Sequence, residues 1–71
     1  SNTQEPIRPP TPAERTLKLR QTIKKEVNQK AYRYGQTSEE INKWIKLQFG
    51  KPRADMNNHE LEAALEAVRA L

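Results

Sequence analysis

The chain has 71 residues, no cysteine and a formal net charge of +4 at pH 7. This length fits one small domain, and the lack of cysteine excludes disulfides and thiolate metal sites. No apolar run approaches the roughly 18 residues of a membrane span, and the first residues lack the apolar core of a secretory signal, so we expect a cytoplasmic protein.

The N-terminal segment, residues 1–11, is typical of a linker. Ser1-Asn2 is typical of an expression scar, and the Pro-rich stretch 4–12 resembles a connection leading in from a larger protein. We therefore expect residues 1–11 to be a disordered linker or tag, and residues 12–71 to form an excised domain.

A first helix is predicted over about residues 12–34. Thr11 supplies a capping hydroxyl, Pro12 is tolerated at the first helical position, and Glu14 stands three residues after the cap. Gly35 can adopt the left-handed conformation that ends a helix. The apolar stripe between these signals has spacings of three or four and comprises Leu19, Ile23, Val27, Ala31 and Tyr34.

A second helix is predicted over about residues 38–49. Thr37 and Glu40 form another capping box, and Gly50 followed by Pro52 ends the segment. Its apolar side consists of Ile41, Trp44, Ile45 and Phe49.

A third helix is predicted over about residues 58–70. Asn57 caps it, Glu60 reaches back to the cap, and Met56 can pack on Leu61 as a hydrophobic staple. Its stripe continues through Leu61, Leu65, Val68 and Leu71.

These elements predict an all-α fold, a small three-helix bundle preceded by a flexible Pro-rich segment. The two short connections should make consecutive helices near neighbours, and no alternating strand pattern competes with this interpretation. We expect the core to be led by Trp44, Phe49, Ile23 and Leu65.

Residues suited to catalysis or metal binding are few. His59 is the only histidine, and a lone imidazole cannot make a zinc site, so a structural or solvent-exposed role is expected. Glu62 and Glu66 are i,i+4 neighbours typical of a solvated helix face, and there is no glycine-rich phosphate loop. We therefore expect no enzyme activity, no cofactor, no metal and no small-molecule substrate.

Positive charge is concentrated in residues 16–53 and negative charge in residues 54–71. One interpretation is a protein-interaction surface in which basic residues surround an apolar groove that takes an acidic peptide or helix. Its contacts would be Lys24, Lys43, Trp44 and Lys46. Trp44 has an alternative role as a core residue, because tryptophan is enriched both in small cores and at interface hot spots.

A second interpretation is direct binding of single-stranded nucleic acid by the first helix. Cations along its outer face could neutralise successive phosphates, and Tyr32 could stack on a base. The residues are Arg15, Lys18, Lys25, Tyr32 and Arg33, on the face opposite Ile23 and Val27. An ordinary solvated face that keeps the domain soluble would give the same pattern.

Residues 30–71 carry a longer pattern, a basic helix ending in glycine followed by "QTSEEINKWIKLQFGKPRADMNNHELEAALEAV". This pattern resembles the C-terminal helical tails of phage single-strand annealing recombinases, and a related arrangement occurs in Mu-type GemA regulators. The matching positions are Thr37, Glu40, Ile41, Trp44, Ile45, Phe49, Gly50, Leu61 and Leu65.

The resemblance implies a module that recruits partner nucleases or single-strand-binding proteins, while annealing belongs to a larger N-terminal domain. On that basis the chain would be part of a phage or prophage DNA recombination or replication protein. The resemblance does not account for the long basic first helix. A separate role of that helix in nucleic-acid binding therefore stays open.

Overall fold

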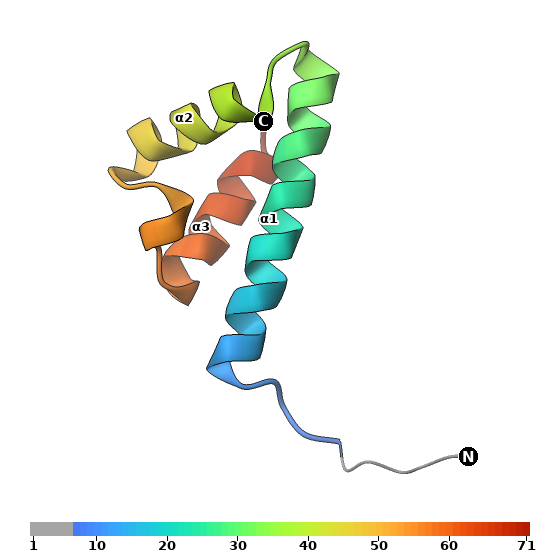
Figure 1. Ribbon diagram of the computed structural model, residues 1–71, viewed down its shortest axis with the longest axis vertical. Helices are drawn as coiled ribbons and strands as arrows, with labels where there is room; N and C mark the ends of the chain where they lie inside the picture. Colours follow the sequence, from blue (N-terminus) through green and yellow to red (C-terminus); the bar gives the residue numbers. More distant parts are fainter. Residues whose placement is uncertain (1–6) are drawn as a thin grey trace, which may run out of the picture.

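The computed structural model describes residues 7–71, and its regular structure there is entirely helical (Figure 1). The elements are α1 (Pro12–Tyr34), α2 (Ser38–Phe49), the short 3-10 turn η1 (Arg53–Asp55) and α3 (Asn58–Arg69). The all-α three-helix fold is confirmed. The predicted bounds agree with the structure except that α3 ends at Arg69 and that η1 was not foreseen. The predicted disorder of residues 1–6 lies outside the described residues, and residues 7–11 are exposed without regular structure.

All three predicted capping boxes form. In each, the cap side chain accepts a hydrogen bond from a backbone N–H three residues on, and the glutamate there accepts from the backbone N–H of the cap. The pairs are Thr11 with Glu14, Thr37 with Glu40, and Asn57 with Glu60. Gly35 and Gly50 end α1 and α2 with φ of 66° and 74°, so the helix bounds follow from local chemistry.

The first and last helices lie side by side and run in the same direction (Figure 1). The middle helix, α2, begins near the end of α1 and runs crosswise to both, and the connection that contains η1 leads on to the start of α3. Near the start of both helices Thr16 donates to Asn58, whose amide donates to the carbonyl of Pro12 at 3.2 Å. Near their ends Lys30 donates to the carbonyl of Arg69 at 3.1 Å. The expectation that consecutive helices are near neighbours is therefore incomplete, because the most extensive packing of α1 is against α3.

The core is aliphatic and lies among the three helices. Its largest fully buried side chains are Ile23, Val27, Ile45, Leu61 and Val68, joined by Ala31, Ile41, Met56, Ala64 and Leu65. The buried position of Met56 agrees with its predicted role beside Leu61.

The expectation that Trp44 and Phe49 lead the core is wrong. Both are only partly buried, because they lie at the rim of the core, where the helices do not cover them completely. Tyr34, also expected on the apolar stripe, is 51% exposed, since it is the last residue of α1 and lies at the end of the bundle. None of the helices within residues 7–71 is long and apolar enough to cross a membrane.

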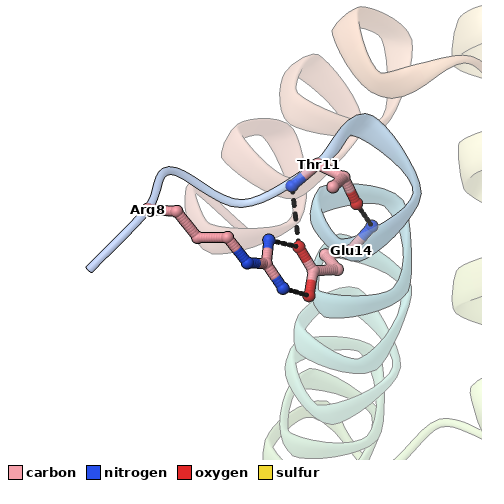
Figure 2. Close-up of polar contacts among 3 residues, drawn as sticks. All are labelled: Arg8, Thr11 and Glu14. Carbon is pink, nitrogen blue, oxygen red and sulfur yellow. Dashed lines mark hydrogen bonds and ion pairs between the residues drawn. The ribbon is translucent and has the colours of Figure 1, made fainter. Parts of the chain in front are cut away.

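An ion pair holds the Pro-rich segment against the start of α1 (Figure 2). Arg8 donates two parallel hydrogen bonds to the carboxylate of Glu14, at 2.9 and 3.1 Å. The same carboxylate accepts from the backbone N–H of Thr11 at 2.8 Å. These contacts, that of Arg8 first, lower the pKa of Glu14 from 4.5 to about 2.

Acidification is expected to release this junction. The pKa of Glu14 is lowered in the folded chain. The carboxylate therefore stabilises the fold at pH values above 4.5, and this contribution is lost as the pH falls toward about 2. A carboxyl titration by NMR should show this low midpoint together with fraying of the first turn of α1. The variant Arg8→Met should move the midpoint upward, and an unchanged midpoint in that variant would contradict the assignment.

Candidate functional site

A groove of about 580 Å³ lies between α1, α2 and the connection that contains η1. Five of its lining residues are cations, of which two come from α1, two from α2 and one from η1: Arg20, Lys24, Lys43, Lys46 and Arg53. The apolar part of the lining is Leu61, Pro52 and Ala54, with Leu61 fully buried. We call this feature the basic groove.

The spacing along each helix explains why these side chains meet. Arg20 and Lys24 are four residues apart on α1, and Lys43 and Lys46 are three apart on α2, so each pair occupies one face of its helix. Both helices turn their apolar stripes to the common core, which brings the adjoining basic edges to opposite sides of the groove. Arg53 is added by η1, directly after Pro52.

The positive charge of the basic groove is not neutralised within residues 7–71. The ion pairs there join Arg8 to Glu14, Lys51 to Glu60 and Arg69 to Glu26, and they include none of the five groove cations. Glu39 is the single acidic residue of the lining. Burial, and secondarily the charge of Arg20, lower the pKa of Arg53.

Arg20 is the most constrained cation in the groove. Its guanidinium donates to the carbonyl of Arg53 at 3.0 Å and to those of Ala54 and Met56 at 3.5 Å. These bonds fasten the connection between α2 and α3 to the middle of α1. On the wall formed by α2, the side-chain oxygen of Asn42 is buried without a hydrogen-bond partner in the described part of the chain.

The structure brings three of the four predicted partner-binding residues together. Lys24, Lys43 and Lys46 line the basic groove, but Trp44 does not. Trp44 lines two other hollows, one with Tyr34 and Leu71 and the other with Phe49 and Leu71. The reason is helical geometry, since Lys43 and Trp44 are consecutive residues and point to different sides of α2. The predicted set therefore does not form one surface.

Two of the five groove cations, Arg20 and Arg53, were missed by the sequence analysis. Arg20 precedes Lys24 by four residues, so its position on the same helix face as Lys24 was a usable signal. Arg53 stands in a segment that was interpreted as a plain connection, and no periodicity marks it. Its place in the groove depends on η1 and on the bond from Arg20.

The predicted nucleic-acid-binding residues lie on the exposed outside of α1. All five are exposed, and Tyr32 has 91% of its surface accessible: Arg15, Lys18, Lys25, Tyr32 and Arg33. Their cations take part in no ion pair among residues 7–71. The guanidinium of Arg33 lies 5.5 Å from the ring centre of Tyr34, a cation–π contact on the exposed last turn of α1.

The side chains considered for catalysis do not converge. His59, Glu62 and Glu66 are exposed on α3. Within residues 7–71 there is no group of three or more histidine, cysteine, aspartate or glutamate side chains placed to hold a metal ion.

Comparison of the chain with protein-family models, curated proteins and solved structures gives no match. The resemblance to the tails of phage annealing recombinases therefore remains a hypothesis that depends on the sequence pattern of residues 30–71.

Proposed function

We propose that this chain is a non-catalytic protein-interaction module that binds an acidic segment of a partner protein in the basic groove. The observation that carries the proposal is the convergence of five cations, none ion-paired within residues 7–71, around the exposed apolar surface of Pro52 and Ala54. The sequence resemblance supports a parent protein that acts in phage or prophage DNA recombination or replication.

The physical argument combines charge with apolar contact. A concave surface lined mainly by positive charge, here five cations against Glu39, concentrates the field and accelerates encounter with a partner of opposite charge. An aliphatic side chain that covers Pro52 and Ala54 would lose contact with water and slow dissociation. An acidic segment that also carries aliphatic residues satisfies both features.

The test uses a short capped synthetic peptide of alternating glutamate and leucine, and a matched peptide with glutamine in place of glutamate. We expect the glutamate peptide to bind more tightly and to shift NMR signals around the groove. The double variant Lys43→Glu/Lys46→Glu should weaken binding at least about tenfold, since it replaces attraction with repulsion.

The matched control is Lys18→Glu/Lys25→Glu, which makes the same charge change on exposed positions of α1 outside the groove lining. It should alter affinity only slightly, and more at low salt. Equal losses in the two double variants, or no binding of the glutamate peptide by the unmodified chain, would reject the proposal.

Single-stranded nucleic acid binding by α1 is the second candidate, favoured by the nearly complete exposure of Tyr32 beside unpaired cations. Contact with several phosphates predicts a log–log slope of affinity against salt of about −0.7 per phosphate. Fluorescence titration with an oligonucleotide should give this slope and a loss on Tyr32→Ala, with Tyr34→Ala as the control. Weak binding with a flat salt response would reject this candidate.

A further inference from the structure

We infer that Arg53, held in position by Arg20, is the residue of the basic groove that binds a carboxylate of the partner, and that this carboxylate stands next to an aliphatic side chain. The inference rests on the proposed function and adds to it a specific anchor and a specific chemistry for the bound segment.

The hydrogen bonds of Arg20 make it a positioning residue. Its guanidinium is directed at the backbone of the connection, with its shortest bond, 3.0 Å, to the carbonyl of Arg53 itself. The longer contacts, to the carbonyls of Ala54 and Met56, hold the residues that follow Arg53 in the connection. Arg20 therefore contributes charge to the groove but uses its donors to hold η1.

Arg53 differs from Arg20 in having no acceptor for its own side chain. Among residues 7–71 its guanidinium takes part in no hydrogen bond and no ion pair, although the residue is partly buried. A planar guanidinium presents parallel donors that match the two oxygens of a carboxylate, as Arg8 does with Glu14 in this chain. The groove lysines are exposed and carry compact, strongly hydrated charges, which suits them to attraction more than to oriented recognition.

The rest of the lining favours a peptide over a nucleic acid. The apolar contribution comes from Leu61, Pro52 and Ala54, and no aromatic side chain is among the lining residues to stack on a base. A volume of about 580 Å³ accommodates a short segment and not a whole helix. A carboxylate on Arg53 with a neighbouring aliphatic side chain over the exposed Pro52 and Ala54 would match both parts of the groove.

The deciding variant is Arg53→Lys, which keeps the charge and removes the planar donor pair. We expect it to weaken binding of the glutamate–leucine peptide about tenfold and to remove most of the preference over the glutamine peptide. The control is Arg69→Lys, which makes the same exchange at an exposed position outside the groove lining and should leave affinity within about twofold. Circular dichroism and thermal unfolding of each variant establish that the fold is retained. In a separate competition measurement, inorganic phosphate serves as the competing anion.

The outcomes separate the two proposals. If the unmodified chain binds the peptide and Arg53→Lys binds equally well, the role of Arg53 is overturned while the proposed function stands. If phosphate displaces the peptide at concentrations where acetate at equal ionic strength does not, the assignment to carboxylate is overturned. If the unmodified chain does not bind the glutamate peptide, the proposed function fails and this inference fails with it.

Discussion

The substitution Ile45→Ala is expected to destabilise the fold by about 2–5 kcal/mol, the usual cost of truncating a buried isoleucine to alanine. Ile45 has no exposed surface and lies in the core that all three helices share. The loss combines the transfer of the removed carbons to water with the cavity that they leave. Because small domains have only about 5–15 kcal/mol of total stability, a large part of it would disappear.

The matched control is Leu47→Ala in the same helix, two residues further on, where the side chain is 73% exposed. It removes comparable aliphatic volume from a position that contributes little burial, so we expect a change within about 0.5 kcal/mol. Urea unfolding followed by circular dichroism measures both free energies. Similar values for the two variants would contradict the packing described for α2.

The substitution Arg20→Leu is expected to cost about 1–3 kcal/mol and to loosen the connection between α2 and α3. It removes the donors to the carbonyls of Arg53, Ala54 and Met56. The hydrogen bonds to Arg53 and Met56 are partly buried. Partly buried acceptors left without a partner account for the expected cost. Amide hydrogen exchange should accelerate most in residues 53–56, where the lost bonds lie.

Lys24→Leu is the control for this variant, since Lys24 lines the same groove from the same helix and is exposed. It makes no side-chain hydrogen bond among residues 7–71, so its loss should change stability by less than about 0.5 kcal/mol. Equal exchange rates in residues 53–56 for both variants would show that Arg20 does not hold the connection.

The helix bounds could be predicted from the sequence because the chemistry that sets them is local. A cap residue, a glutamate three residues later and a terminal glycine satisfy backbone groups within one turn, and each signal here acts as expected. The burial of Ile23, Val27, Ile45 and Leu65 follows from periodicity alone. Tyr34 breaks that rule because periodicity does not tell where the neighbouring helices stop.

The candidate site could be predicted only in part because it depends on contacts distant in sequence. Lys24, Lys43 and Lys46 were found from charge and helix faces, whereas Arg53 enters the groove through a bond from a residue 33 positions earlier. The pairing of α1 with α3 likewise has no local signal, and it decides which edges of α2 remain open. Helical periodicity, in contrast, already places Trp44 with Ile41 and away from Lys43, so its separation from the lysines could have been predicted.

The parallel pairing of α1 with α3 also bears on how the chain acquires its structure during synthesis. The main packing partner of α1 is α3, the last of the three helices to be synthesised, and α2 alone covers only part of the packing surface of α1. A nascent chain that ends before residue 58 would therefore expose Val27 and Ile23 to solvent, and its helices would be only marginally formed. Stable folding should be all-or-none, with α3 as the element whose arrival triggers it.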